Sequence, residues 1–353
     1  MNLVNRINAF AKLGEVLRNP DSVYFKSLAS EITSLKELIN SSQFVNPWFT
    51  PDNVDYALKS IGHFLKVHLL EKWVNHYEAK NFEHCKPKTV AVVMAGNIPL
   101  VGFHDYLSVL ISGHKLLAKL SSSDHQLLPL LNQILEKVEP CFSERVTFAD
   151  GKLDHFDAII ATGSNNTSRY FEYYFEKYPH IIRKNRNAAA VLTGSESDDD
   201  LHLLGDDIFR YFGLGCRSVS KLYVPKNYKF DRFYEAIQDY VDVINHSKYK
   251  NNYDYYKAIY LVNKTPHLDN GFLMLKEDVQ LSSPVSVLFY EEYNTINELK
   301  SILKNRSNEL QCIVAAGKPN YIHNSILPGR TQHPRLSDYA DDVDTLKFLA
   351  GLK

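Results

Sequence analysis

Cys216 is the residue of this sequence best suited to covalent chemistry. It lies in residues 213–218 (GLGCRS), between glycines and beside an arginine. Small neighbours let a substrate carbonyl reach the sulfur, and nearby positive charge lowers the pKa of a thiol, which makes more of the nucleophilic thiolate available. A structural role is the alternative, because free cysteine is among the most buried residue types. The segment predicts a nucleophile without excluding that alternative.

A second segment has the pattern of an anion-binding turn. Residues 156–161 form an apolar run typical of a buried strand, and Gly163 and Ser164 follow it at the start of a predicted helix. Backbone N–H groups at the start of a helix can bind an anion. The alternative, which this motif taken alone favours, is an ordinary turn with a serine cap.

The sequence does not predict a metal site. Residues 195–200 (SESDDD) are acidic, but their spacing is not that of an EF-hand, and acidic residues in a first helical turn stabilise the helix dipole. We expect them to cap the next helix. The cysteines form neither a CxxC motif nor a cluster with histidine, which argues against structural zinc and against a disulfide framework. They are Cys85, Cys141, Cys216 and Cys312.

Composition excludes several classes of protein. The 40 Lys and Arg residues nearly balance the 41 Asp and Glu residues, so no nucleic-acid or membrane-surface partner is expected. The N-terminus lacks the charged start and apolar core of a signal peptide, and no apolar stretch approaches the ~20 residues of a membrane span. A chain of 353 residues predicts about two domains. We expect a cytoplasmic protein.

The elements that must position these residues follow from apolar periodicity. Residues 7–17, 28–38 and 54–77 have helical spacing, and after Pro87 strands and helices alternate, which indicates an α/β architecture. Helices are expected at 101–112 and at 126–138, the latter capped by residues 121–124 (SSSD), and the tyrosine-rich residues 249–260 are expected to pack in a second domain. Strands are expected at 89–94, 115–120, 156–161, 188–192, 219–224, 284–289 and 310–315.

Several of these segments together resemble the LuxC family of acyl-CoA reductases, within the aldehyde dehydrogenase-like superfamily. The match runs in the right order from about residue 85 to the C-terminus, and the helical N-terminal part is matched only in character. The segments that carry the resemblance are 96–105 (GNIPLVGFHD), 119–122 (KLSS), 178–187 (YPHIIRKNRN), 215–221 (GCRSVSK) and 328–336 (PGRTQHPRL).

The resemblance implies an α/β, aldehyde dehydrogenase-like fold with two Rossmann-like α/β domains and a helical N-terminal segment. We expect residues 1–187 to form the helical segment with the nucleotide-binding domain, and residues 188–325 to form the catalytic domain that carries the cysteine. Residues 326–353 would be a tail that packs back on the fold. Members of the superfamily commonly pair, so we also expect a homodimer.

The resemblance also implies a reaction. Cys216 would attack the carbonyl of an acyl-CoA or another acyl thioester, and a reduced nicotinamide would deliver hydride to the enzyme-bound thioester, which then releases an aldehyde. Asn97 stands where the superfamily has an asparagine that donates to the oxyanion, together with the backbone N–H of the nucleophile. Alternatively, Asn97 has no catalytic role and is an ordinary residue of the turn formed by residues 96–99 (GNIP).

Relatives that produce a carboxylate use a glutamate on the strand before the cysteine helix to activate water. Here the corresponding segment has no acid between Glu176 and Glu196. Without a base for water, the acyl-enzyme should survive for hydride transfer. The departure therefore favours an acyl-CoA reductase over a carboxylate-producing dehydrogenase.

The resemblance further implies how a cofactor would be bound. Lys119 matches the lysine that ends the second strand and precedes the residues holding the adenosine ribose. Relatives that prefer NAD often carry a glutamate three residues later, whose charge would repel a 2′-phosphate. Ser122 occupies that position, with Ser121 beside it, and a hydroxyl can donate to a phosphate. We therefore predict NADPH.

Two further places complete the predicted cofactor site. Gly163 and Ser164 match the Gly-Ser at the helix that approaches the pyrophosphate. Gln280 stands where many relatives have a glutamate for the nicotinamide ribose, and it can still hydrogen-bond a hydroxyl.

Other functions remain open from sequence alone. Reduction of an acyl phosphate or another activated carboxylate would use the same steps once Cys216 is acylated. A catalytically silent nucleotide-binding protein would keep the fold, and a cysteine thioesterase would need a base for water that the sequence does not offer.

Overall fold

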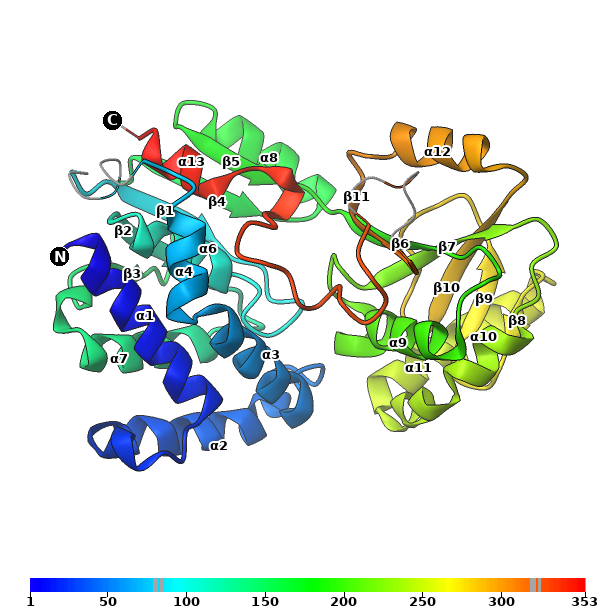
Figure 1. Cartoon of the computed structure of the whole chain (residues 1–353), viewed down its shortest axis with the longest axis horizontal. Helices are drawn as coiled ribbons and strands as arrows, with labels where there is room; N and C mark the ends of the chain where they lie inside the picture. Colours follow the sequence, from blue (N-terminus) through cyan, green and yellow to red (C-terminus); the bar gives the residue numbers. More distant parts are fainter. Residues whose placement is uncertain (79–81, 83–85, 318–321, 323–324, 353) are drawn as a thin grey trace. The chain divides into compact units, whose positions relative to one another are not determined.

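The computed structural model describes residues 1–352 except residues 79–81, 83–85, 318–321 and 323–324. The chain divides into two compact units, which Figure 1 shows in the colours of the sequence. Unit 1 comprises Met1–Lys184 and Arg335–Lys353, and unit 2 comprises Asn185–Pro334. Unit 1 is therefore built from two stretches that are far apart in the sequence.

Unit 1 is organised around a parallel sheet of strand order β3-β2-β1-β4-β5. Because every strand pair in it is parallel, the loops that follow the strands emerge at one edge of the sheet. The strands are β1 (Thr89–Val93), β2 (Lys115–Lys119), β3 (Val146–Phe148), β4 (Ala158–Thr162) and β5 (His180–Arg183).

Helices cover both faces of this sheet, because its strands alternate buried side chains between the two faces. Val90 and Val92 pack in the large core with the N-terminal helices, whereas Ala91 and Ile159 pack in a smaller cluster with Phe171 of α8. The helices are α1 (Leu3–Arg18), α2 (Ala29–Val45), α3 (Pro51–Phe64), α4 (Val67–Val74), α6 (Phe103–Ile111), α7 (Leu127–Val138) and α8 (Asn165–Phe175).

Unit 2 contains a mixed sheet of order β11-β6-β7-β10-β9-β8, in which only the pairing of β8 with β9 is antiparallel within the described residues. Its strands are β6 (Asn187–Val191), β7 (Val219–Pro225), β8 (Leu268–Asp269), β9 (Met274–Glu277), β10 (Val287–Tyr293) and β11 (Leu310–Ala315). Each of the two units therefore has the α/β architecture that the sequence predicts.

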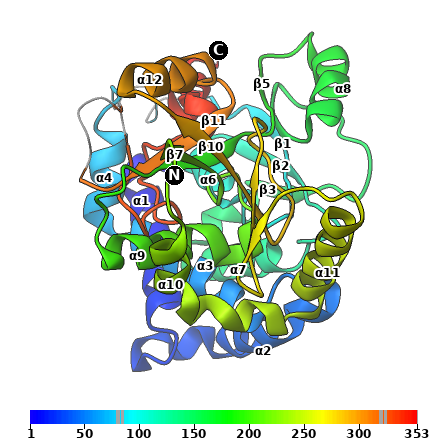
Figure 2. The same ribbon diagram turned by 90° about the vertical axis from the view of Figure 1, so that its right-hand side faces the viewer.

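The helices of unit 2 also lie on both faces of their sheet. Figure 2 shows α12 on one side and α9, α10 and α11 on the other. Tyr253 and Tyr260 of the tyrosine-rich helix are buried against β9 and β10, which confirms their expected role in packing. The helices are α9 (Asp198–Phe209), α10 (Asp231–Ala236), α11 (Ser247–Val262) and α12 (Ile296–Asn305).

The end of the chain returns to unit 1 and completes its core. Helix α13 (Thr345–Ala350) buries Leu346 and Leu349 fully in the large core. Beside it, Arg183 forms a buried ion pair with Asp105 of α6 and donates to the Thr345 hydroxyl at 3.0 Å. A buried ion pair is tolerated because each charge has a hydrogen-bonding partner.

Some predicted elements differ from the structure. The run 54–77 contains two helices, because the chain breaks at Leu65 and Lys66 between α3 and α4. The expected cap of α7 by residues 121–124 is wrong: α7 follows Gln126 and has no side-chain cap. The cap of α9 is confirmed, since Ser197 and Asp200 form a reciprocal capping box.

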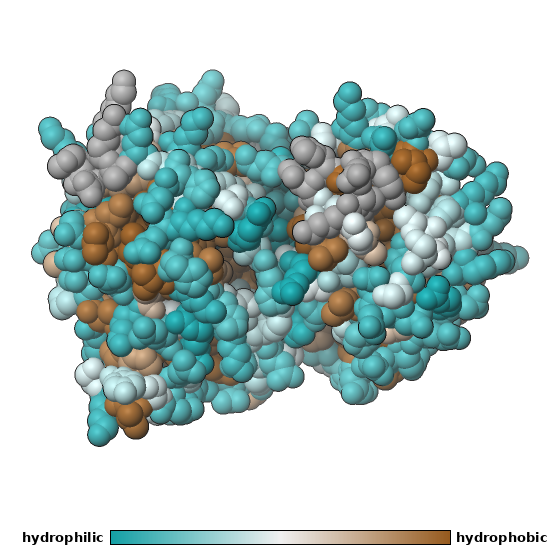
Figure 3. Space-filling model, in the orientation of Figure 1, coloured by the Kyte–Doolittle hydropathy of each residue, from teal (hydrophilic) through white to brown (hydrophobic). Residues whose placement is uncertain are grey.

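Figure 3 shows a largely hydrophilic face interrupted by small apolar patches. This is the normal distribution for a chain whose large apolar side chains lie mainly in packed cores. Across the described part of the chain, no helix combines the length and the apolar character needed to cross a membrane.

Candidate functional site

In unit 1 the predicted site residues lie in the loops that follow β1, β2 and β4. Asn97 is exposed in the loop after β1, and Lys119 is exposed at the end of β2. Ser121 and Ser122 follow it, and Gly163 comes directly after β4. Because these strands are parallel neighbours, their loops meet at one edge of the sheet, the usual place for a ligand in such a fold.

The loops after β1 and β2 are in close contact. A Cβ atom on Gly96 would lie only 2.6 Å from Ser121 Oγ, so only glycine fits beside Asn97. Asn46, which directly follows α2, is buried and donates its side-chain amide to the carbonyls of Gly96 and Ser123, at 3.5 Å each. The residues expected to serve the oxyanion and the ribose thus belong to one packed structure.

Asp124 belongs to the loop after β2 and links it to the loop after β1. Its Oδ2 atom accepts a hydrogen bond of 2.7 Å from the N–H of Leu100, whose φ of 57° lies in the left-handed region that is costly for a non-glycine residue. Burial raises the pKa of Asp124 to about 6. The sequence misassigned this residue to a helix cap, because an acid after serines is also the usual capping pattern.

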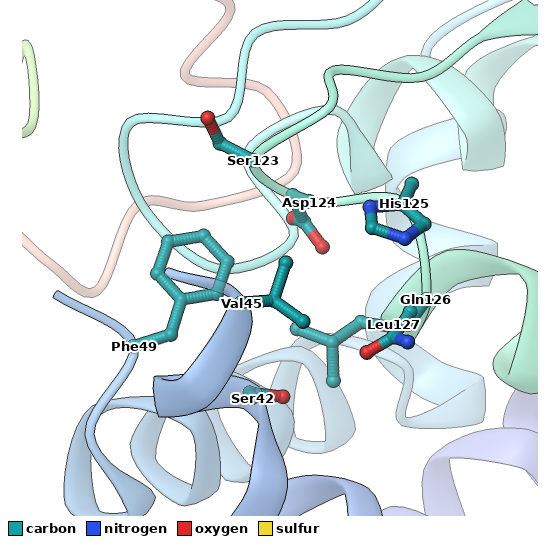
Figure 4. A pocket seen from close by; sticks show the side chains of 8 residues that line it. All are labelled: Ser42, Val45, Phe49, Ser123, Asp124, His125, Gln126 and Leu127. Atoms are coloured by element: carbon teal, nitrogen blue, oxygen red, sulfur yellow. The ribbon is translucent and has the colours of Figure 1, made fainter. Parts of the chain in front are cut away.

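Figure 4 shows the surroundings of Asp124. Its side chain lies in a small hollow together with Phe49, Val45 and His125. The empty space there, about 190 Å³ including open solvent, is too small for a dinucleotide. The hollow therefore does not by itself accommodate the predicted cofactor.

Gly163 and Ser164 form the junction between β4 and α8. A Cβ on Gly163 would meet Thr167 at 3.0 Å and Phe171 at 3.1 Å, so glycine allows the helix to approach the strand closely. The Ser164 hydroxyl accepts from the Thr167 N–H at 3.2 Å and caps the helix. The serine cap is therefore observed, and the binding of an anion at this turn stays a prediction.

In unit 2, Cys216 is half-buried on the turn that precedes β7. The chain enters this turn through three successive left-handed residues, namely Tyr211 (φ 54°), Phe212 (φ 57°) and Gly213 (φ 76°). Such a conformation costs roughly 1–3 kcal/mol for each non-glycine residue and persists only where the surroundings enforce it. Strain of this kind clusters at functional sites, so the backbone adds to the sequence evidence for Cys216.

The strand after Cys216 holds the loop that carries Gln280. The Ser220 hydroxyl donates to the carbonyl of Leu281 at 2.8 Å, and the Lys221 ammonium donates to the carbonyl of Asp278. Gln280 itself is exposed, and its N–H donates to the Asp278 carboxylate at 2.9 Å. The structure therefore connects Cys216 and Gln280 through β7.

Lys221 is a residue whose role the sequence did not reveal. Its side chain is fully buried, and it forms an ion pair of 2.8 Å with Glu291. Burial lowers the pKa of Lys221, whereas Glu291 acts in the opposite direction. A lysine inside a predicted apolar strand was the available signal, because lysine is almost never fully buried unless it is paired.

Glu196, the first acid after the basic segment, is engaged by its own turn. Its carboxylate accepts from the Thr193 N–H at 2.6 Å, from the Thr193 hydroxyl at 2.8 Å and from the Gly194 N–H at 3.0 Å. It therefore serves as a local cap. Among the described residues, no group of three or more His, Cys, Asp or Glu side chains is placed to hold a metal ion.

The remaining cysteines differ from Cys216 in exposure. Cys141 is exposed and Cys312 is buried on β11, while Cys85 lies outside the described residues.

The pairing of Asn97 with Cys216 would join the two units and stays a prediction.

Comparison with known proteins gives a family and a fold. The model of the family described as acyl-CoA reductase (LuxC) matches residues 2–306. No curated protein matches the sequence. Aldehyde dehydrogenase 21 of Physcomitrella patens, solved with succinate, is 14% identical with a TM-score of 0.68, and the match covers 99% of this chain and 84% of that chain.

Two more solved structures are similar to the chain. The Mycobacterium tuberculosis aldehyde dehydrogenase complexed with NAD+ is 14% identical with a TM-score of 0.61, and the match covers 90% of this chain and 74% of that one. An E. coli NADP dependent enzyme is 12% identical with a TM-score of 0.63, and the match covers 91% of this chain and 74% of that one. At these identities the likeness establishes the fold.

Proposed function

Because the chain belongs to the LuxC family of acyl-CoA reductases, we propose that it reduces a fatty acyl thioester to the aldehyde with NADPH. The Cys216 thiolate attacks the acyl carbonyl, and the coenzyme A thiolate leaves and takes up a proton. NADPH, when bound, supplies the hydride that converts the enzyme thioester to a thiohemiacetal. Its collapse breaks the C–S bond, releases the aldehyde and returns the Cys216 thiolate.

The observation that carries this proposal is the turn of Cys216. A half-buried thiol follows three left-handed residues, and its position on the turn suits a nucleophile better than a residue of the packed interior. Glu196 is occupied by Thr193 and Gly194, which supports an acyl-enzyme that waits for hydride rather than for water. In this proposal Asn97 donates to the oxyanion.

The loop after β2 supports the choice of NADPH. Asp124 is the only acid among residues 119–125, and its carboxylate accepts from Leu100. Ser122 is exposed, so a hydroxyl is available to a 2′-phosphate there. Gly163 leaves room where a side chain would collide with α8, which fits the close approach of a dinucleotide. The other proposed contacts of the cofactor are Lys119, Ser121, Ser164 and Gln280.

The homodimer and the cytoplasmic location also stay predictions.

Mass spectrometry of the intact protein after mixing with a long-chain acyl-CoA, without NADPH, tests the first step. We expect one acyl adduct on the wild type, none on Cys216→Ala, and an unchanged adduct on the matched control Cys141→Ala, whose thiol is exposed. Adding NADPH should discharge the adduct with equal amounts of NADPH consumed and aldehyde formed. An adduct that persists in Cys216→Ala, or its discharge as a fatty acid, would refute the proposal.

A further inference from the structure

The segment 328–332 (PGRTQ) lies beyond residues 2–306, the part of the chain that the family match covers. It follows a short pairing with the edge of the sheet, where the N–H of Ile326 donates to Ile313 at 2.8 Å and its carbonyl accepts from Ala315 at 2.9 Å. From there the chain runs to α9, the helix that leads into the turn of Cys216.

Asp207, near the C-terminal end of α9, binds this segment. Its side chain is fully buried, and its carboxylate accepts from the Gly329 N–H at 2.7 Å, the Thr331 N–H at 3.0 Å and the Thr331 hydroxyl at 2.7 Å. A buried carboxylate is costly unless such donors compensate it. Gly329 is left-handed (φ 72°), and a Cβ on it would lie 3.1 Å from Leu203, so the segment rests directly on the helix.

The other end of the segment reaches the turn of Cys216. Gln332 is buried, and its Nε2 atom donates to Ser218 Oγ at 3.4 Å. The same Ser218 oxygen accepts the N–H of Gly215 at 3.2 Å, which closes the turn around Cys216. The segment is thus hydrogen-bonded both to the helix before the strained turn and to the turn itself.

We propose that Asp207 is a positioning residue for Cys216. It anchors the segment 328–332, and the segment holds the turn through Gln332 and Ser218. Two successive left-handed non-glycine residues, Tyr211 and Phe212, need such external support. The role in acyl transfer rests on the proposed function, whereas the support of the turn does not.

Alkylation of Cys216 by iodoacetamide, followed peptide by peptide with mass spectrometry, tests the support without any acyl substrate. Asp207→Asn and Gln332→Ala should each raise the rate at Cys216 about fivefold, because a loosened turn exposes a half-buried thiol more often. The double variant should not exceed the larger single effect, because both residues act through one segment. Cys312, buried on β11, should keep its rate.

Two controls sharpen the test. Asp199→Asn, an exposed acid in the first turn of α9, should leave Cys216 unchanged. Thr331→Val removes the hydroxyl bound to Asp207 and should behave like Asp207→Asn, whereas Thr331→Ser retains it and should behave like the wild type. An unchanged rate at Cys216, or equal increases at Cys216 and Cys312, would overturn the proposal.

The rate of acyl transfer from acyl-CoA to Cys216 is then measured in the same variants. We expect it to fall while alkylation rises, since a mobile thiol is easier to reach but is less often aligned with the oxyanion donors. If even the wild type accepts no acyl group, the proposed function fails while the alkylation result still decides the role of Asp207. If acyl transfer is unchanged although alkylation rises, Asp207 does not position Cys216 for chemistry.

Discussion

Two carboxylates, of which Asp207 is fully buried and Asp124 is half-buried, support the two loops expected to carry out the chemistry. Asp124 binds the backbone beside Asn97, and Asp207 binds the segment that contacts the turn of Cys216. In both cases burial raises the pKa to about 6. Each carboxylate thus stabilises a strained backbone at the expense of some global stability near neutral pH.

This linkage predicts a pH-dependent stability for unit 1. The pKa of Asp124 rises from 3.8 to about 6 on folding, so the folded protein holds this proton more tightly than the unfolded chain does. The contribution of Asp124 to stability is therefore fully present below about pH 4 and is lost as the pH rises through about 6. The unfolding free energy of the wild type, minus that of Asp124→Asn, should fall by up to about 3 kcal/mol over this range.

Urea unfolding followed by tryptophan fluorescence measures this difference. Both tryptophans, Trp48 and Trp73, belong to unit 1, so the signal reports that unit. Asp154→Asn, which removes an exposed acid of the same unit, should show no such pH trend. A difference that is constant with pH, or one that grows as the pH rises, would contradict the assignment.

At the scale of elements, the sequence predicted most of the strands and failed where local pattern competes with tertiary contacts. The strand 310–315 was predicted with its observed bounds, because its apolar residues follow the polar Asn308 and Glu309 and end shortly before Gly317. The strand expected at 284–289 begins later, at Val287, because a turn precedes it: the Val287 N–H donates to the Pro284 carbonyl at 3.0 Å, and Ser286 is left-handed with a φ of 67°. Strands β3, β5, β8 and β9 were not predicted, because two to four residues are too few for a period to be visible.

Strand β7 shows which parts of the site local pattern cannot reveal. Cys216 and the family motif around it were recognisable from the sequence. The ion pair of Lys221 with Glu291 and the bond from Ser220 to Leu281 depend on residues about 60 to 70 positions away. Such partners become visible only once the sheet brings β7 and β10 together.

We expect Lys221→Met to loosen the loop that carries Gln280. The change removes the donor to the Asp278 carbonyl and leaves the Glu291 charge without its partner, which costs less than the ~3–5 kcal/mol of a fully buried pair because Glu291 is partly exposed. Hydrogen exchange at residues 278–281 should accelerate in Lys221→Met, and to a smaller extent in Ser220→Ala. The matched control Lys226→Met, at an exposed position just after β7, should exchange like the wild type. Unaltered protection at residues 278–281 would show that β7 does not hold this loop.

At the scale of the whole molecule, the fold class follows from the sequence and the two-segment construction of unit 1 does not follow from periodicity alone. The last stretch contributes α13, whose Leu346 and Leu349 are fully buried among residues from the first half of the chain. Tyr77 adds a polar link, since its hydroxyl donates to Asp344 at 2.8 Å. Burial raises the pKa of Tyr77 to about 12, so this link persists at physiological pH.

Leu346→Ala should destabilise unit 1 by about 2–5 kcal/mol, the usual cost of a cavity in a packed core. The urea transition followed by tryptophan fluorescence should move to lower concentration. Val343→Ala removes carbon atoms from a partly exposed tail residue and should shift the transition by less than about 0.5 kcal/mol. Equal shifts for the two variants would mean that the tail does not complete the core of unit 1.

The return of α13 to unit 1 has a consequence for biosynthesis. During translation the ribosome releases the parallel sheet of β1–β5 and then the entire unit 2 before residues 335–353 emerge. Until that moment the large core of unit 1 lacks Leu346 and Leu349 of α13, and incompletely covered apolar surface is the kind that chaperones bind. Unit 2 is a single continuous stretch of the chain, so all of its residues are synthesised before unit 1 is complete. Unit 2 can therefore finish folding first, although unit 1 begins earlier in the sequence.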